Sequence, residues 1–249
     1  MFQDRRGVSE TIGFVLVFSL IVLTVGVVLT VGYGGLQDAR DAERVNNAER
    51  AFDVLADNVE DITHRGAPSR GTEVRLAEAS LGAGSPTYLN VTGVNDSGGR
   101  VFSTGNYSTD TVVYEAENTQ IRYAAGAVTR IQQSGSVMVV PPEFVLASDH
   151  TIVPIVQLSV EDRTVAGSQT VLVRTERRIR NVVVSEDDGV ETLRVNVSTP
   201  APNAWGSYLR GQGLNCTEYG GGERGKLVCT LSDVDRVKIV WFELKVGFE

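Results

Sequence analysis

Residues 5–33 read RRGVSETIGFVLVFSLIVLTVGVVLTVGY, and this stretch decides what kind of protein the chain builds. The run from Thr11 to Val31 is dominated by Val, Leu, Ile and Phe, and no charged residue lies between Glu10 and Asp38. At a rise of ~1.5 Å per residue, a helix of this run spans about 30 Å, the hydrocarbon thickness of a bilayer. Lipid offers backbone groups no hydrogen-bond partners, so we predict a transmembrane helix over residues 11–31.

Three kinds of membrane segment fit this pattern: a cleaved secretory signal, a plain N-terminal anchor, and the helix of a filament subunit. A secretory signal has a shorter apolar core of ~7–15 residues, followed by a small-residue cleavage site. Here the core is longer and no A-x-A-like site follows it, although Gly32-Tyr33-Gly34-Gly35 consists mostly of small residues. Because Arg5 and Arg6 precede the run, the positive-inside tendency places the N-terminus in the cytoplasm and the rest of the chain outside.

The composition is acidic, with 31 Asp and Glu residues against 23 Lys and Arg and a formal net charge of −8. The only lysines are Lys226, Lys238 and Lys245. An acidic, lysine-poor surface is typical of a high-salt environment, where screening removes the repulsion among carboxylates. An ordinary acidic protein with GC-rich codon usage is the alternative. With no basic cluster in the sequence, nucleic acid is not an expected partner.

Residues 36–64 are expected to continue as an amphipathic helix beyond a join loosened by the glycines at 32–35. His64, Gly66 and Pro68 form a helix stop, with a basic last turn, a glycine cap and a proline beyond. Apolar residues recur at steps of three and four, which places them on one side of the helix. Either the chain's own downstream domain or a neighbouring subunit must cover this stripe, whose residues are Val45, Ala48, Phe52, Leu55, Val59 and Ile62.

From residue 69 onward, short β-branched or alternating segments are separated by turn residues. This pattern favours a sandwich or barrel over β-α units, so the predicted fold class is α+β: a long N-terminal helix and an antiparallel, sandwich-like β-rich extracellular head over residues 69–249. A short helix is expected near residues 199–210, and Pro141-Pro142 is expected to divide the β-region. The predicted strands are residues 72–79, 87–94, 111–118, 119–125, 127–133, 136–140, 151–160, 169–178, 181–186, 191–198, 226–231 and 237–246.

Two features are consistent with an exported head. Cys216 and Cys229 flank a short glycine-rich loop, and we expect a disulfide between them; two free buried thiols are the alternative. The chain also carries N-x-S/T sequons, which on an exported protein indicate surface loops able to carry glycans, whereas unmodified turn residues are the alternative. The sequons begin at Asn90, Asn95, Asn106, Asn196 and Asn215.

Catalytic and metal-binding patterns are lacking in the sequence. His64 and His150 are not in a metal-ligand spacing, and the two cysteines are not C-x-x-C. The consecutive residues Ser148-Asp149-His150 cannot form a triad, because adjacent side chains cannot adopt that geometry. GVSETIG lacks the Gly-Lys-Ser/Thr of a phosphate loop. We therefore expect no enzyme activity, no cofactor and no metal.

The N-terminus resembles that of archaeal type IV pilins and pilin-like proteins, especially those of haloarchaea, over residues 5–63. Arg5-Arg6-Gly7, then Val8-Ser9-Glu10-Thr11-Ile12-Gly13 and the apolar run, carry the resemblance. It implies a class III leader over residues 1–7, cut by a prepilin peptidase after Gly7, with Val8 as the mature N-terminus and a pilin-like helix over residues 8–65. Bacterial pilins usually carry a glutamate five residues after the cut. Here that position is Ile12, and the acid is Glu10.

The expected function is that of a structural subunit, minor or pilin-like, of a type IV pilus-like filament or a related secretion or adhesion apparatus. The expected partners are the prepilin peptidase, other pilin subunits, the membrane and, indirectly, an assembly ATPase and platform protein. Subunit packing is expected to use Glu10 and the stripe residues Val45, Phe52, Leu55, Val59 and Ile62. The alternatives are a monomeric anchored surface protein that binds sugars or envelope components and, third, an exported hydrolase.

Overall fold

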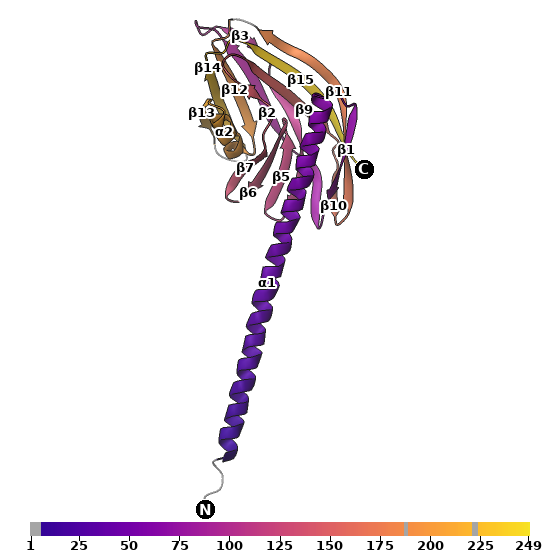
Figure 1. The fold of residues 1–249 in the computed structure, drawn as a ribbon, viewed down its shortest axis with the longest axis vertical. Helices are drawn as coiled ribbons and strands as arrows, with labels where there is room; N and C mark the ends of the chain where they lie inside the picture. Colours follow the sequence, from indigo (N-terminus) through magenta and orange to yellow (C-terminus); the bar gives the residue numbers. More distant parts are fainter. Residues whose placement is uncertain (1–5, 187–188, 221–223) are drawn as a thin grey trace, which may run out of the picture. The chain divides into compact units, whose positions relative to one another are not determined.

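The structure, a computed structural model, describes residues 6–186, 189–220 and 224–249, with side chains from residue 11 onward in those ranges. One long helix, α1 (Arg6–Thr63), is followed by two β-sheets and a short helix, α2 (Pro202–Gly211) (Figure 1). The predicted α+β class, with an N-terminal helix and a β-rich head, is confirmed.

The chain divides into two compact units, Met1–Asn46 and Asn47–Glu249. Helix α1 is unbroken across this division and through Gly32, Gly34 and Gly35, where the sequence predicted a looser join. A glycine inside a helix costs only about 1 kcal/mol relative to alanine, so these glycines do not by themselves end the helix. The second unit therefore begins with the last part of α1 and continues into the head.

Sheet A is the smaller sheet, with five strands. Its central pair, β11 and β15, is antiparallel, but β15 runs parallel to its other neighbour, β9. This parallel pair departs from the antiparallel expectation; β9 and β15 are far apart in sequence, so no hairpin fixes their relative direction. In spatial order the strands are β1 (Ser69–Arg75), β11 (Thr170–Glu186), β15 (Val237–Phe248), β9 (Thr151–Val160) and β8 (Val145–Leu146).

Sheet B is a 10-stranded sheet in which every pair is antiparallel among the described residues. Two short strands, β3 (Arg100–Ser103) and β10 (Thr164–Gly167), pair with the long β2 outside the main order. That order is β13 (Asn215–Tyr219), β14 (Gly225–Ser232), β12 (Thr192–Thr199), β2 (Ala79–Val94), β4 (Tyr107–Ala116), β5 (Thr119–Ala124), β6 (Ala127–Gln132) and β7 (Gly135–Val140).

An apolar core joins the two sheets and α2. Strand β12 alternates, so that Leu193 and Val195 point inward and are buried in the same cluster as Ile155 of β9 and Trp205 of α2. Such alternation is expected for a strand with one buried face and one solvent-exposed face. The backbone N–H of Leu158 on β9 also donates to Thr109 Oγ1 on β4 at 2.9 Å, which ties sheet A directly to sheet B.

The predicted strands are found with shifted ends, and the remaining differences have simple causes. Residues 169–178 and 181–186 form one strand, β11, which bends at two register shifts instead of ending. Strands β3, β8, β10 and β13 were not predicted; each has two to five residues, too few to show alternation. Pro141-Pro142 lies between β7 of sheet B and β8 of sheet A, so it marks a crossing between sheets.

Candidate functional site

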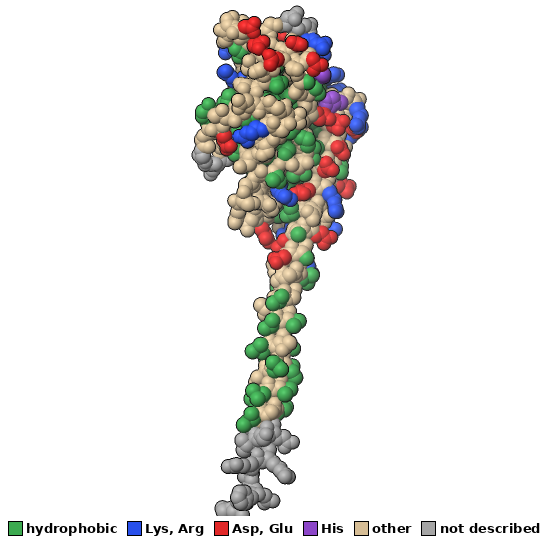
Figure 2. Space-filling model, turned by 60° about the vertical axis from the view of Figure 1, so that its left-hand side comes forward, with side chains coloured by type: hydrophobic (Ala, Val, Ile, Leu, Met, Phe, Trp, Pro, Cys, Tyr) green, Lys and Arg blue, Asp and Glu red, His purple; other side chains and the backbone are tan. Residues whose placement is uncertain are grey.

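The first candidate surface is the apolar half of α1. From Ile12 to Leu36 its large apolar side chains are exposed on every side of the helix, and Figure 2 shows them along this segment. By length and composition this helix is able to cross a membrane. Thr24 Oγ1 donates to the Leu20 carbonyl and Thr30 Oγ1 to the Gly26 carbonyl, at 2.7 and 2.8 Å. The hydroxyls are therefore satisfied within the helix, as an apolar environment requires.

The proposed processing residues lie at the edge of what the structure describes. Arg5 is outside the described residues, whereas Arg6, Gly7, Val8 and Glu10 belong to α1 but have side chains outside the described part. The roles of these residues in cleavage and in subunit registration stay predictions.

The apolar stripe of α1 is covered by the chain's own head. Phe52, Leu55, Val59 and Ile62 are each at most 3% exposed in the single chain. The sequence left open whether the head or a neighbouring subunit covers this stripe, and in the structure the head covers it. The role of these four side chains in subunit packing stays a prediction. Val45 is half-buried and belongs to the N-terminal unit.

Polar contacts fix the end of α1 on both sheets. Asn58 Nδ2 donates to Thr72 Oγ1 on β1 at 2.9 Å. On sheet B, Arg130 Nη1 of β6 lies 2.7 Å from Glu49 Oε1. These contacts reach three strands, because Arg177 of β11 also donates to the Ile62 carbonyl near the helix end. The helix end and the head thus form one packed body.

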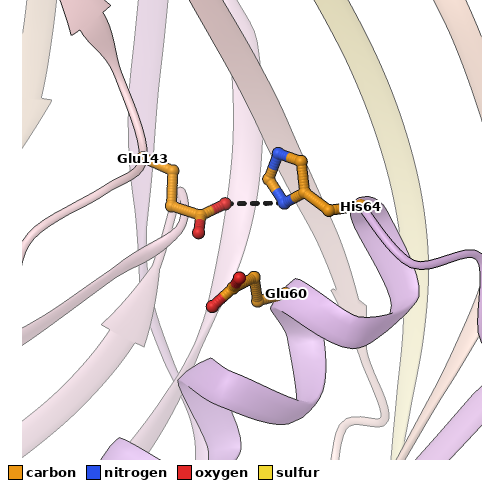
Figure 3. Close-up of side chains that lie close together, drawn as sticks. All are labelled: Glu60, His64 and Glu143. Carbon is orange, nitrogen blue, oxygen red and sulfur yellow. Dashed lines mark ion pairs between the residues drawn. The ribbon is translucent and has the colours of Figure 1, made fainter.

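The second candidate site is a cluster of two carboxylates and one imidazole. Glu60 and His64 are four residues apart at the end of α1, and Glu143 follows Pro142 in the segment between β7 and β8. Figure 3 shows the three side chains converging, with His64 Nδ1 2.7 Å from Glu143 Oε2. One ligand atom from each residue lies within 4.8 Å of the other two.

The surroundings of this cluster are partly apolar. A small cavity of about 60 Å³ next to Glu60 and Glu143 is lined by residues that include Val59, Tyr123 and Val156. Partial burial raises the pKa of the Glu143 carboxyl; the negative charge of Glu60 adds to the rise, and His64 opposes it. The sequence showed no metal-ligand spacing around the histidines, so this cluster was not predicted. The spacing of Glu60 and His64 was visible in the sequence, but Glu143 comes from a distant segment.

The third candidate site is a groove of about 750 Å³ over β2, β12 and β14 of sheet B. Arg194, Arg224 and Lys226 line it, and none of the described residues that line it is acidic. The Arg224 guanidinium lies 5.4 Å from the centre of the Tyr88 ring. Asn196 Oδ1 is buried there without a hydrogen-bond partner among the described atoms. The groove is therefore positively charged on a chain whose net charge is −8.

The sequon asparagines differ in how accessible they are. Asn90 and Asn196 face each other across β2 and β12, and Asn90 Nδ2 already donates to the Gly105 carbonyl at 2.7 Å. Both of these side chains are half-buried, whereas Asn106 and Asn215 are exposed. Asn95 is half-buried in a turn, where its Oδ1 accepts from the Gly99 N–H at 2.7 Å. Glycosylation stays a prediction, and Asn106 and Asn215 are the sites with most room for a glycan.

Two further predicted positions are clearly placed. Cys216 on β13 and Cys229 on β14 are paired in register and form a disulfide, with an S–S distance of 2.05 Å. Ser148, Asp149 and His150 lie together in the β8–β9 turn. His150 Nδ1 lies 3.0 Å from Oδ1 of its neighbour Asp149, and both are well exposed, so this turn makes a local contact and not a triad.

These surfaces define a class of protein: a β-rich head on a single long helix whose N-terminal half is apolar enough to cross a membrane. The chain belongs to DUF7289, a family of unknown function, which it matches over residues 6–247. No curated protein and no solved structure shows significant similarity to the chain.

Proposed function

We propose that the protein is a structural subunit, minor or pilin-like, of a type IV pilus-like filament or a related secretion or adhesion apparatus. Before assembly it sits in the cell membrane as a single-pass protein with a cytoplasmic N-terminus and an extracellular head. The prepilin peptidase removes residues 1–7, and an assembly ATPase with its platform protein drives incorporation. The role requires no catalysis by the chain itself.

The observation that carries this proposal is the exposed apolar surface of α1 on a helix that is continuous with the head. A helix exposing Val, Leu, Ile and Phe on all sides needs either lipid or other apolar helices around it. Since lipid tails are as apolar as these side chains, exchanging lipid for neighbouring helices depends on packing and not on hydrophobicity. The same segment therefore serves the membrane-inserted subunit and the filament core.

The way α1 ends supports the same role. A subunit pulled from the membrane by its helix must transmit force to its head without the helix detaching. The stripe from Phe52 to Ile62 is buried, and hydrogen bonds to β1 and β11 hold the last turns. A plain anchor needs no such attachment, because a flexible linker would suffice.

Filament formation is tested in an archaeal host that contains a prepilin peptidase and a pilus assembly system. We expect the wild-type chain in filaments sheared from the cell surface, and Gly7→Glu retained in the membrane fraction. Lys238→Gln is the control, because it changes an exposed side chain on β15 of the head, away from α1 and from the cleavage point. Absence of the wild-type chain from sheared material, with normal membrane levels, would contradict the proposal.

A second candidate function is favoured by the groove on sheet B: an anchored surface protein that binds an anionic carbohydrate. Three cations, a tyrosine and amide groups suit the carboxylates and hydroxyls of such a polymer. Burial, the main cause, and the nearby charge of Arg224 lower the pKa of Arg122 to about 10, so a fourth cation lies close to Arg224.

Carbohydrate binding is measured with the full chain in detergent micelles, using polygalacturonate and a neutral galactan as probes. The second function predicts binding of the uronate polymer alone and its loss in the Arg194→Gln, Lys226→Gln double variant. Lys238→Gln removes a lysine on β15, outside the groove, and should bind normally. Equal binding of both polymers, or of neither, excludes the anionic-carbohydrate function and leaves the filament proposal unaffected.

A further inference from the structure

The cluster of Glu60, His64 and Glu143 brings together the side-chain types that bind divalent transition metals. Imidazole nitrogen and carboxylate oxygen are both ligands of Zn²⁺, Co²⁺ and Mn²⁺, and three such ligands leave positions for water. The ligand atoms lie within 4.8 Å of one another, which is close enough for all three to belong to one ion's coordination sphere. Magnesium and calcium are less suited to this set, because they prefer oxygen ligands alone.

The two elements that supply the ligands are held in place independently of any metal. Glu60 lies in the last turn of α1 and His64 follows directly after the helix, where its backbone N–H donates to the Glu60 carbonyl at 2.8 Å and keeps the two residues neighbours. On either side of Glu143, Pro142 and Phe144 are buried, and the Pro142 carbonyl accepts hydrogen bonds from Tyr208 Oη and the Phe144 N–H. A site built on rigid elements loses little freedom when it binds an ion.

The groups that compete with a metal here are weak. Arg65 Nη2 lies 3.3 Å from Glu60 Oε1, but its main partner is Asp61, and the arginine is 67% exposed. Thr63 Oγ1 is 3.3 Å from His64 Nδ1 and is already bonded to the Val59 carbonyl. Apart from His64, no basic side chain is paired with Glu143 in the described part of the chain. Two neighbouring carboxylates beside a single imidazole therefore favour an added positive charge.

We propose that Glu60, His64 and Glu143 form a binding site for one divalent transition-metal ion, with Zn²⁺ as the expected occupant and water completing its coordination. Each residue supplies one ligand atom: a carboxylate oxygen from Glu60 and from Glu143, and a ring nitrogen from His64. The ion would link the end of α1 to the segment that crosses from sheet B to sheet A. Its role is structural. The ion joins the body of the head to α1, the helix that, under the proposed function, transmits the assembly force.

The test uses the full chain in detergent micelles at constant pH, with Co²⁺ followed by visible absorption and Zn²⁺ by calorimetry. We expect one Co²⁺ per chain, displaced by Zn²⁺, and an upward shift of the head's melting temperature with Zn²⁺ because the ion binds the folded state. His64→Gln and Glu143→Gln should each weaken binding at least about tenfold. Melting of each variant without metal shows whether it is folded.

The control is His150→Gln. His150 is the other histidine of the chain and also lies beside a carboxylate, Asp149, but no third ligand joins it in the described residues. It should bind Co²⁺ and Zn²⁺ as the wild type does. Absence of stoichiometric binding to the wild type at millimolar metal, or equal affinity in the wild type and the folded His64→Gln variant, would overturn the proposal. Neither result bears on filament formation.

Discussion

Arg177 on β11 donates a hydrogen bond of 3.1 Å from its Nη1 to the Ile62 carbonyl, in the last turn of α1. The last carbonyls of a helix have no partner within the helix, and they carry its negative dipole end. A positively charged donor from sheet A therefore satisfies one of them and fixes where the helix ends. Ile62 itself is fully buried, so the contact anchors the point at which the helix meets the head.

Replacing Arg177 with methionine should lower the free energy of unfolding of the head by about 1–2 kcal/mol, because a charge-assisted hydrogen bond is lost and a helix carbonyl is left partly buried. Arg178→Met is the matched control, since Arg178 is the next residue on β11 and is exposed. Denaturant unfolding of the full chain in micelles measures both. Equal destabilisation by the two variants would show that the Ile62 contact contributes nothing specific.

The buried stripe predicts a much larger effect. Phe52 is 0% exposed, and Phe52→Ala should cost about 3–5 kcal/mol through lost burial and a cavity. Val54 lies two residues away and its side chain is 51% exposed. Val54→Ala should therefore change the free energy of unfolding by less than about 0.5 kcal/mol. Phe52→Asp should be worse than alanine, because it buries an unpaired charge. If Phe52→Ala and Val54→Ala melt alike, the head does not cover α1 as described.

The disulfide between Cys216 and Cys229 should stabilise the head by ~3 kcal/mol, mainly by restricting the unfolded chain. The double variant Cys216→Ser, Cys229→Ser should unfold at correspondingly lower denaturant concentration. A reductant should move the wild type to the same midpoint and leave the double variant unchanged. A wild type that does not respond to reductant, with both cysteines titrating as free thiols, would mean that the bond does not form.

One acidic loop cluster predicts a dependence on salt and pH. The negative charge of Asp96 is the main cause that raises the pKa of Glu191, with smaller contributions from burial and from Asp233 and Asp235. Folding raises this pKa, so repulsion is absent below the ordinary pKa of a glutamate and develops as pH rises through the raised value. Glu191→Gln should therefore raise the melting temperature at neutral pH and low salt.

The gain from Glu191→Gln should shrink in molar salt, because screening weakens the repulsion that the substitution removes. It should also shrink in acid, where the carboxyl is protonated in the wild type. Glu73→Gln, which removes an exposed carboxyl from β1, is the control for a general effect of net charge. Thermal melts of both variants over a grid of pH and salt concentration distinguish local repulsion at Glu191 from a general effect of net charge. A gain that is constant over the grid would rule out repulsion as its cause.

Local patterns in the sequence predicted the elements well and their neighbours poorly. The apolar run and the steps of three and four from Ala48 to Ile62 report helix period and burial directly. The residues that cover Phe52 come from strands far away in the sequence. The sequence alone therefore could not decide between the head and a neighbouring subunit. The parallel pairing of β9 with β15 was invisible for the same reason, because neither strand's own residues specify its partner.

The candidate sites show the same limit. Glu60 and His64 are a visible i, i+4 pair, but their third partner, Glu143, is set by where the chain crosses between sheets. The groove needs Tyr88, Ser198 and Lys226 side by side, which follows from the pairing and register of β2, β12 and β14. By contrast, the disulfide could be predicted, because Cys216 and Cys229 flank a short loop and hairpin pairing is local.

The most direct test of the filament-subunit account is the N-terminus of the mature protein. Intact mass and N-terminal peptides should be measured on the chain extracted from a host with and without its prepilin peptidase. The account predicts a start at Val8 when the peptidase is present and a start at Met1 when it is deleted. A start at Met1 in both hosts would indicate a plain anchor, and a start beyond Gly32 would indicate a cleaved secretory signal; either result would contradict the account.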